Sequence, residues 1–333
     1  MKVVILYDRA AEEGATLDQE DVLIQARAIG GALKDLGHEP RVQTVSSNLG
    51  ELTDELRGDR PDLVFNLVES LEGHGRLIHV APAVLDCLRV PYTGSPADAL
   101  YATSNKILTK RLLSGAGIPT PQSVSMEDDP EGDVPPAGTY MIKSVWEHAS
   151  VGIEDDSVVS VESFHRLRLE MKERLLKLGG ACFAERYVDG REFNLSILAS
   201  REGPVVLPPA EILFDDYPVG KRKIVGYHAK WDQGSFEYRH TRRTFEFEHE
   251  DAHLLQDLAQ IARRCWYLFG LRGYGRVDFR VDEENRPWVL EINANPCLSP
   301  DAGFAAAANR AGIYFQEVVE RIVKDAIVCL HTE

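Results

Sequence analysis

The sequence predicts an α/β protein that opens with a parallel sheet and continues with two mixed α+β lobes. Over residues 1–103, β-rich runs alternate with segments that have helical periodicity, which is typical of a parallel sheet with helical crossovers. From 182 to 248 the pattern is mostly β, with polar turns between the runs. At 273–296, two apolar runs flank a polar turn, which predicts a β-hairpin.

Composition narrows the class of protein. A chain of 333 residues with 44% hydrophobic and 27% charged residues is the size of one compact enzyme of two or three lobes. The net charge of −16 disfavours nucleic-acid binding, which needs clustered cations. Apolar runs are only strand-sized and the start has no signal-peptide pattern, so we expect neither a membrane span nor export. The five scattered cysteines form no Cys-x-x-Cys pair, which favours reduced thiols in a cytoplasmic protein.

The first domain is expected over 1–103. A β-rich run at 2–7 precedes a polar loop and a helix whose apolar residues run from Val22 to Leu36, with Gly37 as its C-terminal cap. The alternation then continues with strands at 40–45 and 61–68, a helix at 77–88 and a short strand at 90–94. We therefore expect a parallel sheet with right-handed crossovers.

Two further domains are expected over 104–187 and 188–333. Ser104 is a candidate N-cap for a helix that ends near Leu113, and the acidic, Pro- and Gly-rich stretch at 125–138 is a surface connection. The other expected elements are strands at 140–143, 182–187 and 192–199, helices at 161–178, 252–269 and 314–330, and the hairpin.

The hairpin carries the most informative polar residues. Strict alternation sets Val277, Phe279 and Val281 opposite Arg276, Asp278 and Arg280, and Trp288, Leu290 and Ile292 opposite Val289, Glu291 and Asn293. Asp278, Glu291 and Asn293 should then converge beside Arg276, and such oxygen ligands suit Mg²⁺. The alternative is a half-buried hairpin with a solvated charged face. Two matched motifs, Arg-x-Asp and Glu-x-Asn, favour the metal site.

These motifs resemble the metal-binding strands of the ATP-grasp enzymes, and within them most closely the D-alanine–D-alanine ligase branch. The resemblance continues in order over nearly the whole chain: Tyr92–Ser95, Asn105-Lys106, Ala116–Pro121, Met141–Lys143, Ser150–Gly152, Ala184-Glu185, Gly190–Phe193, Ala229-Lys230, Gly275–Asp278 and Glu291–Pro296. It implies an ATP-grasp fold, with a Rossmann-like N-terminal domain followed by two α+β lobes that grip ATP.

The resemblance implies an ATP-dependent ligase for small-molecule carboxylate and amine substrates. The carboxylate attacks the γ-phosphate of ATP and becomes an acylphosphate, and the amine then displaces phosphate and leaves an amide or peptide bond. Two Mg²⁺ ions, for which Mn²⁺ can substitute, would be held by Asp278, Glu291 and Asn293. The resemblance also implies a homodimer.

The resemblance assigns further site residues. The catalytic residues would be Arg276, Ser150 and Lys230. Lys106 and Lys143 would bind the phosphates of the nucleotide. Glu185 and the main chain of Tyr187 and Val188 would bind adenine, and Glu192 would bind the ribose. Taken singly, each lysine is more often a solvated surface residue, and Lys221–Lys223 make a basic loop an alternative for Lys230. His148 and Ala149 replace a Gly-Ser pair in the family's phosphate-covering loop, which predicts a stiffer loop.

The substrate segments depart from the family. The loop 8–21 lacks the Gly-Gly-x-Ser-x-Glu pattern that ends in the donor-binding glutamate, and Glu12, Glu13, Glu20 or Asp21 could replace that residue. Glu69, Glu72 and His74 could line the donor site, and the main-chain N–H of Cys297 could bind the oxyanion. Asp301 stands near the family's acceptor-binding serine and would repel a carboxylate. We therefore expect an acceptor other than plain D-alanine, such as a cationic or larger amine.

Three functions remain open. The first is a peptide-bond-forming ligase for amino-acid or peptide-like substrates other than plain D-alanine. The second is a D-alanine–D-alanine ligase of peptidoglycan precursor synthesis, against which the altered substrate segments weigh. The third is a catalytically silent ATP-binding protein. The intact set of metal and phosphate residues argues against the third, because an inactive site need not keep them all.

Overall fold

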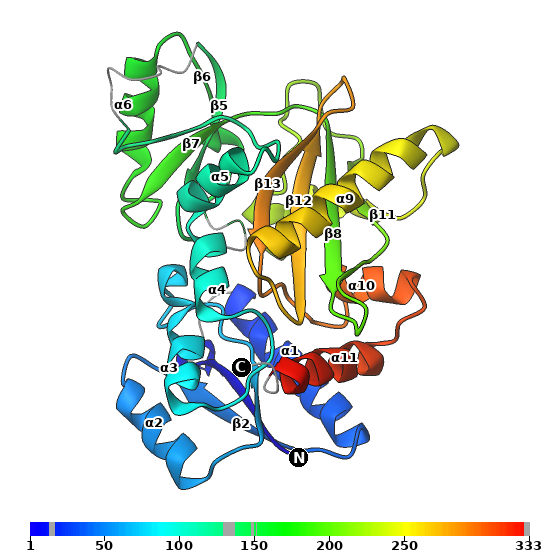
Figure 1. Cartoon of the computed structure of the whole chain (residues 1–333). Helices are drawn as coiled ribbons and strands as arrows, with labels where there is room; N and C mark the ends of the chain where they lie inside the picture. The colour runs from blue at the N-terminus through cyan, green and yellow to red at the C-terminus, as the bar shows by residue number, and fades with distance from the viewer. Residues whose placement is uncertain (13–16, 129–136, 148–149, 151, 330–333) are drawn as a thin grey trace.

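The protein is built around three sheets that lie in three separate parts of the molecule (Figure 1). The computed structural model describes residues 1–12, 17–128, 137–147, 150 and 152–329. His148 and Ala149 of the predicted phosphate loop therefore lie outside the described residues. Each domain range expected from the sequence contains one sheet, and the exact boundaries stay a proposal.

The first sheet is parallel, as predicted, with the order β2-β1-β3. Its strands are β1 (Lys2–Asp8), β2 (Glu39–Val45) and β3 (Leu63–Asn66). Its helices are α1 (Leu17–Asp35), α2 (Leu49–Gly58) and α3 (Val80–Leu88). The side chains of β1 are buried from Val3 to Asp8, as expected for a central strand that is covered on both faces.

The second sheet is antiparallel, with the order β4-β7-β5-β6. Its strands are β4 (Ser123–Ser125), β5 (Gly138–Ser144), β6 (Val158–Val161) and β7 (Cys182–Arg186), and the nearby helices are α4 (Ala97–Ser104), α5 (Lys106–Gly115) and α6 (Phe164–Arg174). The prediction that Ser104 caps a helix was wrong, because Ser104 is the last residue of α4. Asn105 caps α5 instead, and its side chain accepts a hydrogen bond from the Leu108 N–H.

The third sheet has the order β11-β10-β8-β12-β13, with β9 paired to β8. Its strands are β8 (Arg191–Leu198), β9 (Val205–Val206), β10 (Ala210–Phe214), β11 (Thr241–Thr244), β12 (Tyr274–Val281) and β13 (Pro287–Asn293). The helices of this part are α7 (Tyr227–Trp231), α8 (Phe236–His240), α9 (Ala252–Leu268), α10 (Gly303–Arg310) and α11 (Phe315–Cys329). α9 covers the apolar face of the sheet, and α11 returns to pack beside α1 (Figure 1).

Two expectations for this part were wrong. The segment from 182 to 248 was expected to hold only strands and loops, but α7 and α8 interrupt it, and helices of five residues are too short to show a helical repeat in sequence. The strict alternation expected for β13 also fails, because a β-bulge shifts the register beside Asp278. Val289 is therefore buried in the core with Ile292, whereas Leu290 lies on the cavity side with Glu291.

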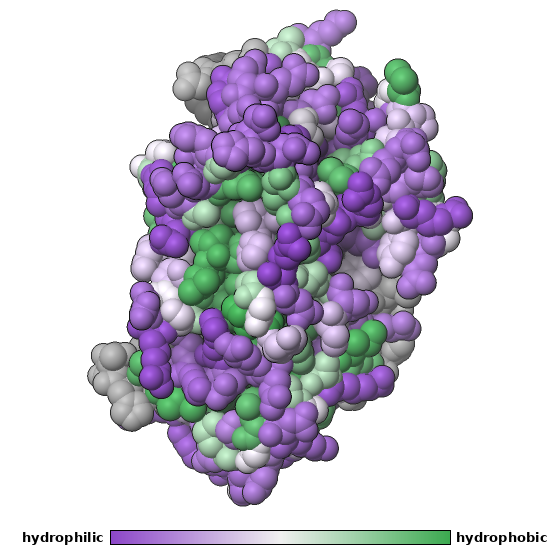
Figure 2. All heavy atoms as spheres, turned by 90° about the vertical axis from the view of Figure 1, so that its right-hand side faces the viewer, coloured by the Kyte–Doolittle hydropathy of each residue, from purple (hydrophilic) through white to green (hydrophobic). Residues whose placement is uncertain are grey.

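The surface is mostly hydrophilic on the face shown in Figure 2, where hydrophobic residues gather towards the middle. Large exposed hydrophobic side chains on the molecule include Tyr267 and Leu268 at the end of α9 and Tyr314 just before α11. Isolated exposed hydrophobic residues of this kind are common on soluble domains. Within the part of the chain that the structure describes, every helix is too short or too polar to span a lipid bilayer.

Gly190 is required at the turn between β7 and β8. Its φ is +139°, and a Cβ there would lie 2.0 Å from the carbonyl oxygen of Val281. We expect Gly190→Ala to lower the free energy of unfolding by about 2 kcal/mol or more, because the backbone must shift. Urea denaturation measures this change. Gly58→Ala, where the added Cβ meets nothing within 4 Å, is the control and should leave stability equal or slightly higher. Equal stability of the two variants would contradict the tight turn.

Candidate active site

Two adjoining cavities contain most of the predicted site residues. The interlobe cavity lies between the second and third sheets and is lined by Lys143, Ser150, Glu185, Tyr187, Val188 and Leu290 among others. The sheet-face cavity has a volume of 470 Å³ and is lined by Glu69, Arg276, Asn293, Cys297 and Asp301 among others. Glu192, Val225, Lys230, Asp278 and Glu291 line both. The two cavities are therefore parts of one cleft.

The floor of the cleft is one face of the third sheet. Cross-strand register aligns its residues in rows: Arg243, Ile212, Glu192 and Arg280 in one, Ala210, Asn194, Asp278 and Glu291 in the next, and Ser196, Arg276 and Asn293 in the third. Side chains that are directly opposite across antiparallel strands share a face. The opposite face carries Val277, Phe279, Val289 and Ile292, which are buried in the apolar core. The apolar packing thus fixes which charges face the cleft.

Asp278 is held by two neighbours on this floor. Nε and Nη2 of Arg276 donate to its two carboxylate oxygens at 2.7 and 2.8 Å, and Nδ2 of Asn194 donates to Oδ1 at 2.8 Å. Burial disfavours the Arg276 guanidinium, but the adjacent Asp278 outweighs burial and raises the pKa of Arg276 further. Arg276 therefore keeps its positive charge despite burial.

Glu291 and Asn293 join Asp278 as expected. Glu291 is the direct cross-strand partner of Asp278, and Asn293 is the partner of Arg276. The side-chain oxygen of Asn293 accepts a hydrogen bond from the Asn295 N–H at 3.0 Å, which orients the amide. Two carboxylates and one amide oxygen thus lie on adjacent strands within a single patch of the cleft.

Glu185 is locked into a buried ion-pair network. Its carboxylate oxygens lie 2.5 Å from Nζ of Lys110 and 2.5 Å from Nζ of Lys143. Nζ of Lys110 also donates to the Thr120 hydroxyl at 2.9 Å. Burial would raise the pKa of Glu185, but the two lysines outweigh burial and lower it, so the carboxylate stays charged. In this structure Glu185 holds two lysines, and contact with adenine stays a prediction.

Three other predicted phosphate and catalytic residues lie around this network. Lys106 is buried, and its Nζ donates to the Glu147 carbonyl at 2.7 Å. Lys230 lines both cavities from α7, and burial and the nearby Arg276 lower its pKa. The Ser150 hydroxyl donates to the Val225 carbonyl at 2.8 Å. Ser150 therefore ties the described part of its loop to the segment that leads into α7.

The expected adenine and ribose residues line the interlobe cavity. The Tyr187 N–H donates to the Thr139 carbonyl at 3.0 Å, so only the carbonyl of Tyr187 could face a purine. Glu192 is buried and pairs with Nη2 of Arg280 at 2.8 Å. This arginine also donates to the Gly190 carbonyl at 2.9 Å, so a single side chain positions Glu192 and the turn beside it.

The side of the cleft that was expected to bind the donor substrate is organised by Gln25 of α1. Its side-chain amide nitrogen donates to Asp21 at 3.3 Å and to Glu69 at 3.2 Å, and its oxygen accepts from the Leu298 N–H at 2.9 Å. The Cys297 thiol donates to Asp21 at 2.8 Å, and burial together with Asp21 raises the pKa of this thiol. The thiol is therefore neutral, which agrees with a main-chain role and not a nucleophilic one.

Glu72 and His74 were expected in the donor site, but neither lies among the described residues that line the two cavities. Both are exposed. Glu72 instead accepts hydrogen bonds from the main chain and hydroxyl of Ser47, which lower its pKa. The structure thus brings only Glu69 of this group to the cleft, together with Asp21.

Asp301 has a cationic neighbour that the sequence pattern did not reveal. Arg243 of β11 lines the same cavity and stacks over Gly303, whose Cβ would lie 3.4 Å from a guanidinium nitrogen. Burial and Arg276 lower the pKa of Arg243, and Asp301 raises it. The charge at this end of the cleft is therefore mixed, and a substrate carboxylate would meet a guanidinium as well as Asp301.

Comparisons with known proteins agree with this geometry. Residues 138–324 match the family described as D-ala D-ala ligase C-terminus. The chain belongs to the D-alanine–D-alanine ligase family. It is 29% identical over 330 residues to the D-alanine–D-alanine ligase of Aquifex aeolicus, covering 97% of this chain and 100% of the relative. It is 30% identical over 334 residues to that of a Synechococcus strain, covering 98% and 93%. An uncharacterised Sinorhizobium fredii protein is also 30% identical, covering 90% and 86%.

Solved structures of this family share the fold. The D-alanine–D-alanine ligase of Bacillus anthracis complexed with ATP aligns with a TM-score of 0.72 at 18% identity, covering 100% of this chain and 99% of that chain. D-alanyl-alanine synthetase A of Vibrio cholerae aligns with a TM-score of 0.73 at 18% identity, covering 98% of each chain. The predicted ATP-grasp fold is confirmed, and the protein is a ligase that forms carbon–nitrogen bonds.

Sequence reasoning missed several residues of the D-alanine–D-alanine ligase site. Lys110 lies four residues after Lys106, on the same face of α5, so helical spacing offered a signal. Asn194 lies two residues after Glu192 on β8, so strand alternation offered another. Gln25 and Arg243 gave no local signal, because their roles come from contacts between distant parts of the chain.

We expect Lys110→Met to lower the free energy of unfolding by about 3 kcal/mol, because it leaves Glu185 buried with one cation in place of two. It should also weaken ATP binding, since Lys143 would lose its fixed position. Urea denaturation and calorimetric titration measure the two effects. Arg111→Met, one residue along and 64% exposed, is the control and should change neither. A Lys110→Met protein as stable as Arg111→Met would show that the network does not support the fold.

Proposed function

We propose that this protein is a D-alanine–D-alanine ligase that uses ATP and Mg²⁺. The single observation that carries the proposal is the group of Arg276, Asp278, Glu291 and Asn293 on the cleft floor, next to buried Lys106 and half-buried Lys143. Such a set neutralises transferring phosphate, which is most of what phosphoryl transfer needs. Support also comes from relatives named D-alanine–D-alanine ligase and from a structural neighbour complexed with ATP.

The comparisons favour this substrate over the main expectation from the sequence, which was an acceptor other than plain D-alanine. That expectation took Asp301 alone and overlooked Arg243. An amino-acid pair fits the charges of the cleft from end to end. Asp21 and Glu69 suit the ammonium of the donor, and Arg243 suits the carboxylate of the acceptor.

The oxygen ligands on the cleft floor fit magnesium. Asp278, Glu291 and Asn293 offer hard oxygen ligands, as Mg²⁺ prefers, but too few for an octahedral ion, so phosphates and water would complete the shell. The ion would supply neutralisation of phosphate charge. Arg276 would bind the transferring phosphoryl group, and Lys106, Lys143 and Lys230 would bind the phosphates as point charges. Glu192 would bind the ribose, and Ser150 and the Cys297 N–H would face the reacting groups. A homodimer is part of the proposal.

The direct test is peptide-bond formation from D-alanine with ATP and Mg²⁺. We expect one phosphate released per dipeptide formed, and loss of both products when EDTA removes the metal. Chromatography of the dipeptide and a phosphate assay measure the two products. Amide formation from another amino-acid pair, with none from D-alanine, would return the function to the broader ligase class. ATP binding without turnover across a panel of amino acids and dipeptides would favour a catalytically silent protein.

Arg243 provides a test of the acceptor site. We expect Arg243→Ala to raise the KM for the acceptor D-alanine by about tenfold, because a charge-assisted hydrogen bond is lost, with little change in the KM for ATP. D-alaninamide lacks the carboxylate. For the wild type, its KM as acceptor should therefore exceed that of D-alanine by about the same factor. Arg310→Ala is the control, since this arginine is 49% exposed and paired with Glu246. An unchanged acceptor KM in Arg243→Ala would remove this residue from the acceptor site.

A further inference from the structure

The cleft is covered by a segment that spans residues 215–240, between β10 and β11. This covering segment contains α7 and α8, and α7 places Lys230 in both cavities. The α7 helix has only five residues, too few to hold a position without tertiary contacts. What fixes the covering segment therefore also fixes a cation of the active site.

Among the described residues, three hydrogen-bonded or ionic contacts join the covering segment to the central lobe, in addition to the packing of Arg222 over the Tyr187 ring. The Ser150 hydroxyl donates to the Val225 carbonyl at 2.8 Å, and the Tyr227 N–H donates to the Ile153 carbonyl at 3.2 Å. The third is an ion pair of 2.7 Å between Nζ of Lys221 and Asp155. The first two use neutral donors, and neutral hydrogen bonds are about half as strong as charge-assisted ones. Of the three, the Lys221 contact is therefore expected to contribute most.

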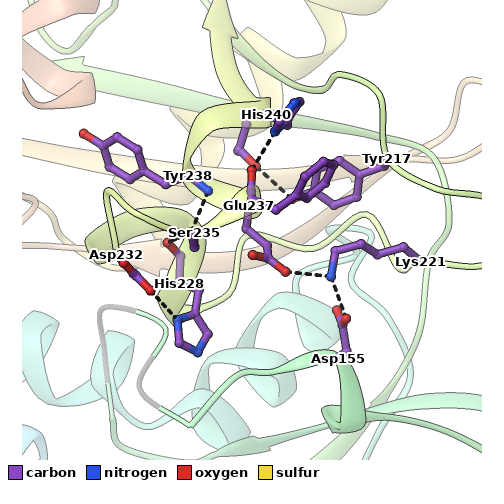
Figure 3. Close-up of polar contacts among 11 residues, drawn as sticks. Asp155, Tyr217, Lys221, His228, Asp232, Ser235, Glu237, Tyr238 and His240 are labelled. Carbon is purple, nitrogen blue, oxygen red and sulfur yellow. Dashed lines mark hydrogen bonds and ion pairs between the residues drawn. The ribbon is translucent and has the colours of Figure 1, made fainter.

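Lys221 is placed between two carboxylates from different lobes (Figure 3). Nζ lies 2.7 Å from Asp155 of the central lobe and 2.7 Å from Glu237 of α8, and the Lys221 side chain is only 17% exposed. Burial disfavours the ammonium, but hydrogen bonds to both carboxylates outweigh burial and raise its pKa. Without this cation, two carboxylates would face each other across the lobe boundary.

The lobes are not packed closely beside this bridge. A cavity of 420 Å³ lies there, lined by Glu154, Asp155 and Asp156 from the central lobe and by Tyr217, His228 and Glu237 from the covering segment. Ile153 of the central lobe and the buried Ile224 and Ala229 of the covering segment line the same cavity, so apolar contacts also contribute at this boundary. The ionic bridge adds to these contacts a charged link that spans the open part of the boundary between the covering segment and the central lobe.

We propose that Lys221 is a positioning residue for the ligase reaction, which holds the covering segment, and with it Lys230, over the nucleotide. The proposal rests on the ligase activity of the family and needs no particular amino-acid substrate. A held cover also keeps water from the acylphosphate. If water, and not the amine, attacks the carbonyl of the acylphosphate, the products are the free carboxylic acid and phosphate. One ATP is then hydrolysed and no amide bond is formed.

The test compares Lys221→Met with Lys223→Met, which removes the same charge two residues away from an exposed side chain. We expect Lys221→Met to bind a non-hydrolysable ATP analogue about tenfold more weakly and to release more than one phosphate per amide bond. Lys223→Met should match the wild type in both. Calorimetric titration gives the affinity, and paired phosphate and dipeptide assays give the ratio. Lys221→Arg, which can still bridge two carboxylates, should restore most of both values.

Asp155→Asn keeps the proposal testable if Lys221→Met does not fold, because Asp155 is 57% exposed. Asp155→Asn should also weaken binding of the ATP analogue and raise the ratio of phosphate to amide. Where Lys221→Met folds, adding Asp155→Asn to it should cause no further change in either value. The proposal is overturned if folded Lys221→Met and Asp155→Asn both match Lys223→Met. Analogue binding does not depend on the amino acid, so this result stays distinct from a failure of the D-alanine proposal.

Discussion

The active site depends on the antiparallel register of the sheet β11-β10-β8-β12-β13. One face of this sheet is apolar and packs under α9, and the other carries the charged floor of the cleft. Because side chains alternate, a slip of one residue on β12 would bury Arg276 and Asp278 and expose Val277 and Phe279. The free energy of burying the apolar face thus also enforces the position of the carboxylates that face the cleft. The same register therefore determines both the apolar core and the positions of the charged residues in the cleft.

The alternation of side chains along a strand correctly predicted which residues of β12 face the cleft. For β13 the prediction was only partly correct. Arg276 and Asp278 face the cleft as expected, and so do Glu291 and Asn293. The error covered Trp288, Val289 and Leu290, because the bulge adds one residue before Glu291 and leaves the parity after it intact. A bulge depends on the partner strand, so the sequence of a single strand does not reveal it. The same holds for the covering segment, whose short helices are defined by their contacts.

Single-residue charge arguments were less successful than pattern arguments. Asp301 suggested repulsion of a carboxylate, but Arg243, which is distant in sequence, lies over the same corner of the cleft. For Glu185 the sequence suggested contact with adenine, which stays a prediction, but it did not suggest that Lys110 and Lys143 engage both carboxylate oxygens. Electrostatic potential sums over all neighbours in space, and a sequence supplies only the neighbours along the chain. These were therefore the points at which the structure changed the interpretation.

A chain with a net charge of −16 must bind a polyanion with a few protected cations. The structure pairs three of the site cations with an internal oxygen: Arg276 with Asp278, Lys143 with Glu185, and Lys106 with the Glu147 carbonyl. Such pairing offsets part of the cost of burying a cation, and a ligand would have to replace the internal partner. Arg276 is the clearest case, since both of its bonds to Asp278 use the nitrogens that would bind a phosphoryl group. Arg276 could bind a phosphoryl group only when Asp278 pairs with another cation, such as a metal ion. Nucleotide binding and metal binding should therefore be thermodynamically coupled in this protein.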